Sequence, residues 1–415
     1  MKQLYILILF VTLPSLAQES IHLKECHNLI AKNYPLAKQN KLLASQNKLE
    51  LAVINTIKLP KFNLDAQATY QSDVIKIPTP NLPVNSQNKD QYRATVSVHQ
   101  LIYNGGVTKA TLNLKTAELK SKQKQIEVTL YKLKEEVNEL YFSILLSEEK
   151  NKLLEEKKRY LEAKLREVES AVKHGVLLPS TVNVLQTELL KIAQQFITIK
   201  SNKLELIETL SSLIGKKLTK TTLFTVPLFE VELDSIISRP ELALFKLKKA
   251  EIDKSITLIS KQNTPKINGF ATGGYGNPGL NMLDNSFQTF YTLGVKLHWN
   301  FFDWNSTKKQ RELTAINNDI ITNQAEIFKL NTRIKLNKYQ KKIDEIKELI
   351  SSDITIIKLR KDVLKAASIQ LENGVITASA YITELVNLFE DESNFIKHKI
   401  ELQLAKANYN IIKGE

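Results

Sequence analysis

Residues with the chemistry for catalysis or metal binding are few in this sequence, and they are scattered. Its six histidines are never spaced as the ligands of a metal ion. The single cysteine, Cys26, stands beside His27, but one cysteine and one histidine do not form a metal site. A lone cysteine also cannot form an intramolecular disulfide. We therefore interpret Cys26 as a buried helical thiol and expect no bound metal.

Nucleotide chemistry and covalent catalysis have no better support. The run Gly273-Gly274-Tyr275-Gly276 resembles a phosphate-binding loop only superficially, because it lies in a strand-and-turn context. The sequence contains no Ser-His-Asp order and no His-Glu-x-x-His helix. We therefore expect no enzyme and no cofactor, and any energy that the protein uses must come from another molecule.

The composition indicates a folded, mostly helical protein of two or three domains. The 415 residues include only 12 glycines and 11 prolines, and 43% of them are hydrophobic. Lys+Arg 58 exceed Asp+Glu 44, which gives a formal net charge of +14. The basic residues are mixed with acidic ones and are not gathered with aromatics. We therefore expect solvated helix faces and no nucleic-acid partner.

The N-terminus has the pattern of a secretory signal peptide over residues 1–17. Lys2 precedes an apolar run from Leu4 to Leu13, and Ser15 and Ala17 are small residues at the positions that a signal peptidase reads. We expect cleavage before Gln18. The apolar run is too short to span a bilayer as a helix, which disfavours an uncleaved anchor.

The elements that organise the chain are long helices with apolar residues at alternating steps of three and four, the spacing of a left-handed coiled coil. The series breaks at residues 175–180, where Gly175 suits a helix end and Pro179 with Ser180 suits the next helix start. The pattern predicts an antiparallel hairpin whose first arm, at roughly 65 residues, is about 100 Å long. The apolar positions are Ile126, Leu130, Leu133, Val137, Leu140, Ile144, Leu154, Leu161, Leu165, Val168, Val172, Leu185, Leu189, Ile192, Phe196, Ile199, Leu206, Leu210 and Leu213.

Two stretches before this hairpin alternate apolar and polar residues, which predicts strands at about 61–71 and 91–101 with one apolar and one polar face. The polar face would carry Asn63, Asp65, Gln67, Thr69, Arg93, Thr95, Ser97 and His99.

The whole pattern then occurs a second time, which indicates an internal duplication. Pro240 and Pro265 each lie 205 residues after Pro35 and Pro60, and Gly374 lies 199 residues after Gly175. We predict a first repeat at 18–214, an irregular equatorial segment at 215–235 and a second repeat at 236–415. The second repeat would hold strands at about 266–276 and 288–301 and a tip at 374–379.

Each repeat is therefore a helix, two strands, a long helix, a tip and a returning helix. Ten-residue strands with one apolar face are long enough to cross a membrane when tilted. Four strands cannot close a barrel, so they would combine with the strands of other copies; two copies give eight strands and three give twelve. The alternative is a soluble coiled-coil protein with two surface hairpins.

The sequence resembles the outer-membrane efflux protein family, the TolC-like ducts, over essentially all of the mature chain. The matching features are the repeat and its tips, Arg239-Pro240, Gln100-Leu101-Ile102-Tyr103-Asn104-Gly105-Gly106 and Leu404-Ala405-Lys406-Ala407-Asn408-Tyr409-Asn410. The resemblance implies a homotrimer with a twelve-stranded barrel in the outer membrane, so that the polar strand faces would line the lumen. It also implies a coiled-coil α-barrel that projects through the periplasm, closed at its far end until a partner opens it.

The resemblance further implies a periplasmic adaptor and an inner-membrane pump as partners, with the adaptor docking on the tips. The docking residues would be Gly175, Val176, Leu177, Leu178, Pro179 and Ser180 with Gly374, Val375, Ile376, Thr377, Ala378 and Ser379. We expect Val176, Leu177 and Leu178 to be exposed there.

Some members of the family carry paired aspartates at the gate, but the aligned positions here are Ala380 and Thr383, with Thr181 in the first tip. Closure would then depend on the packing of Tyr381, Ile382 and Leu385, while Glu384 and Glu188 are carboxylates that could turn inward. One departure from the family pattern is Asp303-Trp304-Asn305 in place of Asn-Gly-Gly. This departure affects only the conformation expected for the local turn, because Trp304 can serve as an interfacial anchor. A periplasmic scaffold without a pore and a porin independent of a pump remain as alternative functions.

Overall fold

The computed structural model describes residues 20–75, 87–231 and 236–415, so the expected signal peptide and residues 232–235 of the equatorial segment lie outside the described residues. The chain divides into two compact units. The first, which we call the tip unit, comprises Met1–Ala37, Glu127–Pro240 and Phe328–Glu415. The second, the sheet unit, comprises Lys38–Ile126 and Glu241–Ile327.

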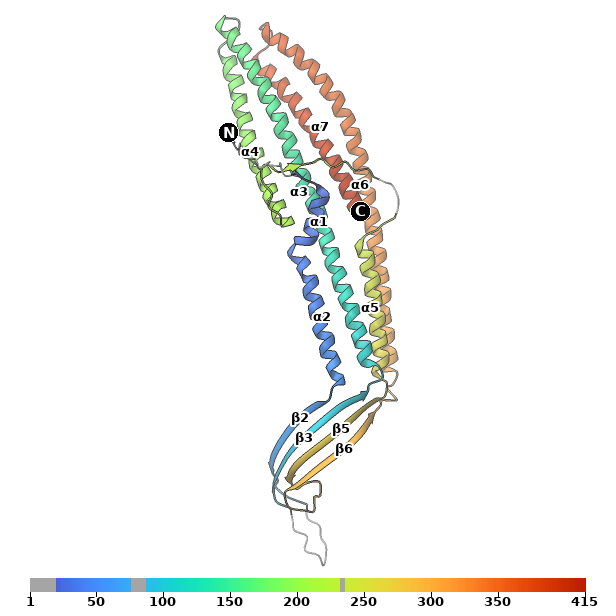
Figure 1. Cartoon of the computed structure of the whole chain (residues 1–415). Coiled ribbons are helices and arrows are strands. Elements are labelled where there is room, and N and C mark those ends of the chain that lie inside the picture. Colours follow the sequence, from blue (N-terminus) through green and yellow to red (C-terminus); the bar gives the residue numbers. More distant parts are fainter. Residues whose placement is uncertain (1–19, 76–86, 232–235) are drawn as a thin grey trace, which may run out of the picture. The chain divides into compact units, whose positions relative to one another are not determined.

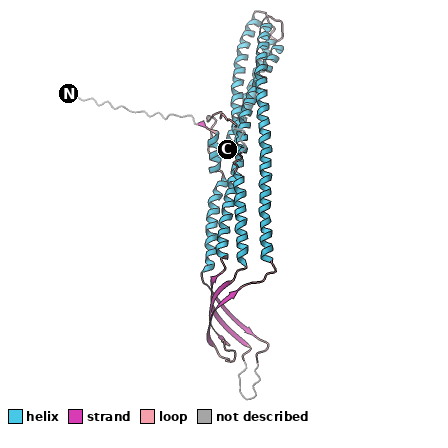
Figure 2. Cartoon of the chain, turned by 90° about the vertical axis from the view of Figure 1, so that its right-hand side faces the viewer, coloured by secondary structure: helices cyan, strands magenta, loops and turns pink. Residues whose placement is uncertain are grey.

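The sheet unit joins helices to one antiparallel sheet of four strands in the order β2-β3-β5-β6 (Figure 1). Each strand continues from a helix or into one, so that strands and helices lie end to end within this unit (Figure 2). Its elements are α2 (Gln39–Asn55), η2 (Thr56–Lys58), β2 (Lys61–Tyr70), β3 (Asp90–Tyr103), α5 (Pro240–Gln262), β5 (Lys266–Asn277), β6 (Gln288–His298) and the first parts of α3 (Val107–Lys173) and α6 (Ser306–Glu372).

The register of the sheet places the alternating polar residues on one face. Asn63 lies opposite Ser97, and Asp65 lies opposite Thr95. Because facing residues of antiparallel strands point to the same side, the apolar partners in between form the other face. That face is solvent-exposed in the isolated chain, and its large side chains include Phe62, Leu64, Val96, Tyr291, Leu293, Val295 and Leu297.

Strand β6 ends at His298, three residues before the expected end at residue 301. His298 pairs with Lys266 at the start of β5. The next residue of β5 in that direction would be Pro265, which has no N–H to donate, so the ladder cannot continue. Trp299 instead donates its indole N–H to the carbonyl of Asn263, 3.2 Å away.

The tip unit is built from α1 (Leu23–Asn33), the three-ten turn η1 (Pro35–Lys38), the second parts of α3 and α6, α4 (Ser180–Ile214) and α7 (Ala378–Lys413). The α3–α4 and α6–α7 hairpins lie side by side in it (Figure 1). Cys26 is buried in α1, as its sequence context predicted. A two-residue parallel ladder between β1 (Ser20–Ile21) and β4 (Leu223–Phe224), which no sequence pattern predicted, holds part of the equatorial segment. No described helix combines the length and the apolar character needed to cross a membrane.

The turn that leads from sheet to helix has the same backbone in both repeats. Gly105 and Gly106 have φ of 64° and 84°, and Trp304 and Asn305 in the second repeat have φ of 51° and 59°. Left-handed backbone costs a non-glycine residue roughly 1–2 kcal/mol. The second turn is supported by the Asp303 carboxylate, which accepts hydrogen bonds from the backbone N–H and hydroxyl of Thr307.

Candidate gate at the helical tips

The two tips end their helices in the same way. Gly175 and Gly374 have φ of 76° and 69°. The N–H groups of Gly175 and Val176 donate to the carbonyls of Val172 and Ala171 at 3.0 and 2.9 Å, and the second tip repeats this pair of bonds at 3.0 and 2.8 Å. This is the Schellman arrangement, in which a left-handed glycine closes the last helical turn. Nothing lies within 4 Å of a Cβ built on either glycine, so backbone conformation, and not space, demands glycine here.

The apolar residues beyond each glycine divide into two groups. Val176 and Leu178 are 59% and 72% exposed, and Val375 is 70% exposed. Leu177 and its counterpart Ile376 pack against the core that α3, α4, α6 and α7 share. The expectation that Leu177 would be exposed is therefore wrong, because the tip turns this side chain back onto its own helices.

The remaining tip residues are mostly exposed. Thr377 is the N-cap residue of α7, and its side chain accepts a hydrogen bond from the N–H of Ala380 at 3.2 Å. Pro179, Ser180 and Ser379 are exposed, whereas Ala378 is buried in the shared core.

Some of the candidate gate residues after the second tip are buried in the core of the hairpins, and others are exposed to solvent. Tyr381 and Leu385 are fully buried and Ile382 packs beside them, while Ala380 and Thr383 are exposed. Burial raises the pKa of the Tyr381 phenol strongly, so this phenol stays neutral. Apolar packing therefore holds the two hairpins together at this level.

Both carboxylates that could turn inward are already paired. Glu384 contacts the Arg360 guanidinium at 3.2 Å, and Arg360 also contacts Asp391 at 3.0 Å. Glu188 lies 2.9 Å from the Lys157 ammonium, and both of these side chains are buried. Within the described residues, no group of three or more histidine, cysteine or carboxylate side chains could hold a metal ion.

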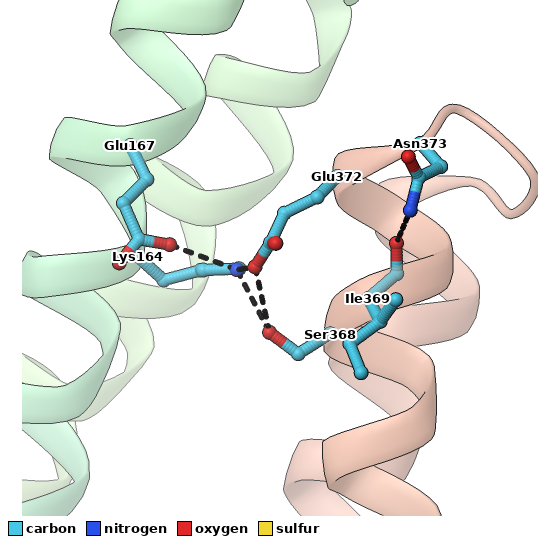
Figure 3. Close-up of polar contacts among 6 residues, drawn as sticks. All are labelled: Lys164, Glu167, Ser368, Ile369, Glu372 and Asn373. Atoms are coloured by element: carbon cyan, nitrogen blue, oxygen red, sulfur yellow. Dashed lines mark hydrogen bonds and ion pairs between the residues drawn. The ribbon is translucent and has the colours of Figure 1, made fainter.

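A buried ammonium group ties the two hairpins together (Figure 3). Lys164 of α3 is only 5% exposed, and its Nζ lies 2.8 Å from Glu167, 2.7 Å from Glu372 and 2.8 Å from the Ser368 hydroxyl. Glu372 and Ser368 belong to α6, so these contacts cross from one hairpin to the other. The Tyr381 ring of α7 lies 5.7 Å from the same Nζ, within the range of a cation–π contact.

The electrostatics of this cluster favour the charged forms. Burial by itself would lower the pKa of Lys164, but hydrogen bonds from Nζ to Glu167 and Glu372 outweigh burial and raise that pKa. The hydrogen bond from Lys164 likewise lowers the pKa of Glu372. The contact is therefore an ion pair, and separating the hairpins would remove Glu372 and Ser368 from Lys164, which would keep only Glu167 of its own helix.

Sequence reasoning missed this cluster because it assigned the lysines of α3 to solvated faces. Lys157 and Lys164 are seven residues apart and lie between Leu154, Leu161 and Val168 in the alternating series of three and four. They occupy seam positions, and a charged residue on a seam was the available signal.

The sheet has its own departure from expectation, because two aromatic residues lie on its polar face. Phe270 lies opposite Gly294, and Phe290 lies opposite Gly274. The Arg93 guanidinium is 5.5 Å from the Phe290 ring centroid. The glycines of β5 and β6 make room for these rings, because a Cβ would lie 2.6 Å from the Phe290 ring at Gly274 and 2.8 Å from the Phe270 ring at Gly294.

Comparisons with known proteins agree with this architecture. Residues 42–216 match the model of a family described as outer membrane efflux protein. Comparison with curated protein sequences found no match. The match over residues 42–216 confirms the resemblance to the outer membrane efflux protein family.

Solved structures of channels share the fold over nearly the whole chain. CusC matches with a TM-score of 0.71 at 12% identity, covering 94% of this chain and 92% of that one. The CmeC outer membrane channel of Campylobacter jejuni matches with a TM-score of 0.66 at 14% identity, covering 94% and 85%. The outer membrane protein VceC of Vibrio cholerae matches with a TM-score of 0.67 at 12% identity, covering 94% and 96%.

Proposed function

We propose that this chain is a subunit of an outer-membrane channel in a tripartite efflux or type I secretion system. The channel would be a passive duct from the periplasm to the exterior, opened by an adaptor and an inner-membrane pump. The observation that carries the proposal is the four-stranded sheet, which has one exposed apolar face and one polar face.

The edges of this sheet favour a trimer. In the described part of the chain, β2 and β6 each have a strand partner on one side only. Unpaired edges cannot face lipid, and four strands are too few to close. Twelve strands from three chains would pair every edge and leave an interior wide enough for a channel lined by the polar face.

The helices of the sheet unit also carry unpartnered apolar surface at helical spacing. On α6, the exposed positions Leu313, Ile316, Ile320 and Ile327 recur at steps of three, four and seven. On α2, Leu42, Leu49 and Val53 are exposed in the same way. Apolar stripes of this extent favour burial against another copy of the chain.

The tips would be the points where a partner acts. Val176, Leu178 and Val375 offer apolar side chains to an adaptor, and the Lys164–Glu372 tie holds the hairpins in the resting arrangement. Opening would separate α6–α7 from α3–α4 and break this tie. Because no sequence motif for nucleotide binding is present, the energy would come from the pump.

Planar-bilayer recording on purified protein of measured oligomer mass tests the proposal. We expect a trimer with a low resting conductance that rises when the partner acts. A periplasmic scaffold would give no conductance, a porin independent of a pump would conduct without a closed resting state, and a monodisperse monomer with intact strands would contradict the trimer.

A further inference from the structure

The polar face of the sheet carries more positive than negative charge. Alternate residues of β2, β3, β5 and β6 belong to this face, because facing residues of antiparallel strands point to the same side. Its ionisable side chains are Lys61, Asp65, Arg93, His99, Lys266, Lys296 and His298. On the described strands, three lysines, one arginine and two histidines therefore share the polar face with a single carboxylate.

Most of this positive charge gathers at the end of the sheet that adjoins the helices. Lys61 begins β2 and Lys266 begins β5, each a few residues after a helix. Lys296 and His298 lie at the end of β6, with His298 opposite Lys266. His99 lies opposite Lys61. These five side chains, which we call the cationic band, occupy three neighbouring rows of the ladder and span about 14 Å along the strands.

Within the described residues, no carboxylate contacts the lysines of the cationic band. Asp65 lies four residues from Lys61 along β2, a separation of about 14 Å. This separation exceeds the Debye length of about 8 Å at physiological salt, so solvent screens the two charges from each other. Asp65 is only one row from Arg93. Beyond β6, the Asp303 carboxylate accepts hydrogen bonds from Thr307 in its own turn. The positive charge of the band is therefore uncompensated.

We propose that the cationic band makes the channel selective for anions, so that solutes with carboxylate, sulfate or phosphate groups pass more readily than cations. The inference rests on the proposed assembly of the sheet into a barrel. Closure repeats the band in every copy and places β6 of one copy beside β2 of another, which gives a ring of lysines around the lumen. Cations lining a narrow passage with low-dielectric walls raise the local concentration of anions, and rings of lysine or arginine act in this way in anion pores.

Reversal potentials in planar bilayers test this inference. The full chain is recorded in a gradient of potassium chloride, because the two ions diffuse at nearly the same rate in water and the reversal potential then reports selectivity. We expect a chloride-to-potassium permeability ratio several-fold above one. A conducting channel with a ratio at or below one would overturn the inference and leave the proposed channel intact. A trimer that never conducts would overturn the proposed channel and this inference with it.

Substitutions in the band assign the selectivity to its lysines. The triple variant Lys61→Gln, Lys266→Gln, Lys296→Gln removes three charges from each copy, so its permeability ratio should fall toward one. The matched control, Lys61→Arg, Lys266→Arg, Lys296→Arg, keeps the charges and should keep the wild-type ratio. An unchanged ratio in the glutamine variant, or an equal fall in both variants, would contradict the inference.

A single substitution provides the same test if the triple variant does not assemble. Lys296 is exposed and lies on the edge strand β6, so Lys296→Gln removes its charge without disturbing a packed contact. We expect a smaller fall in the permeability ratio than in the triple variant, and no fall in Lys296→Gln would contradict the inference.

Discussion

At the scale of single residues, the tip unit contains a buried hydrogen-bond network that constrains a histidine. Asn138 is fully buried, and its amide nitrogen donates to Asn408 at 2.8 Å. Its carbonyl oxygen must therefore accept from His27, whose Nε2 lies 2.8 Å away. Asn408 in turn donates to Glu139 at 3.2 Å. This hydrogen-bond network joins α1, α3 and α7, and it requires the tautomer of His27 that carries its proton on Nε2.

The pKa of His27 makes stability depend on pH. Burial lowers this pKa from 6.5 to about 4, although the hydrogen bond to Asn138 acts in the opposite direction. As the pH falls below 6.5, His27 binds a proton in the unfolded chain but stays neutral in the folded chain. The free energy of unfolding therefore has its full value above pH 6.5 and decreases toward pH 4. At about pH 5 the loss would be about 2 kcal/mol. This loss of stability can be measured as a lower thermal midpoint, followed by the circular dichroism of the helices during heating.

A glutamine at position 27 provides the control. His27→Gln keeps a side-chain donor but removes the titrating group, so the fall in thermal midpoint between neutral and mildly acidic pH should be smaller than in the wild type. Equal falls in the two proteins would assign the pH dependence to other groups.

At the scale of elements, the period of the sequence predicted the helices, the paired strands and the duplication. These features depend on many residues, so one exception does not hide them. The errors arose where a single contact decides the outcome. Pro265 ends the β5–β6 ladder early, and Leu177 packs against the core because the tip turns its side chain back onto its own helices. Lys164 was assigned to solvent, since a sequence does not show which carboxylates two helices bring to one point.

The Lys164 tie predicts the effect of neutralising one partner. Glu372→Gln removes the charge that faces Lys164. Because the Glu372 side chain is 55% exposed, solvent screens this pair, and the contact between the hairpins should weaken by about 0.5–1 kcal/mol. Since each 1.4 kcal/mol is tenfold in an equilibrium, we expect the open fraction in single-channel recordings without partners to rise about two- to five-fold. Lys152→Met on α3, the helix of Lys164, breaks the exposed pair with Glu149 and should leave the open fraction unchanged. An unchanged resting conductance in Glu372→Gln would exclude the tie as part of the gate.

The tip glycines predict a different phenotype. A β-branched residue does not tolerate φ near 70°, so the double variant Gly175→Val, Gly374→Val should distort both Schellman turns and displace Val176 and Val375. We expect export of a fluorescent substrate to be lost from cells, while membrane fractions hold normal amounts of the protein. Lys173→Val, at an exposed helical position near the first tip, is the control and should export normally. Normal export by the glycine variant would refute docking at the tips.

At the scale of the whole molecule, the polar and apolar surfaces lie on separate faces. In the proposed channel, the exposed apolar face of the sheet would meet lipid, and the helical stripes would pack against neighbouring copies. Neither surface is covered within one chain. The sequence predicted this exposure because the alternation is regular, but the number of copies follows from strand closure and not from any residue.

The charge of the assembled gate leads to the last prediction. A ring of carboxylates at a narrow mouth attracts multivalent cations, because focused like charge is unfavourable until it is neutralised. Here the positions of the family's paired aspartates are Ala380 and Thr383, and the nearby Glu384 is held by Arg360. Three copies would bring no free carboxylate from these positions to the mouth. We therefore expect trivalent cations added on the periplasmic side to block single channels only weakly, and Glu384→Gln to respond as the wild type does. Tight block in the wild type that is lost in Glu384→Gln would mean that Glu384 leaves Arg360 in the assembly and forms the acidic ring one residue beyond its usual place.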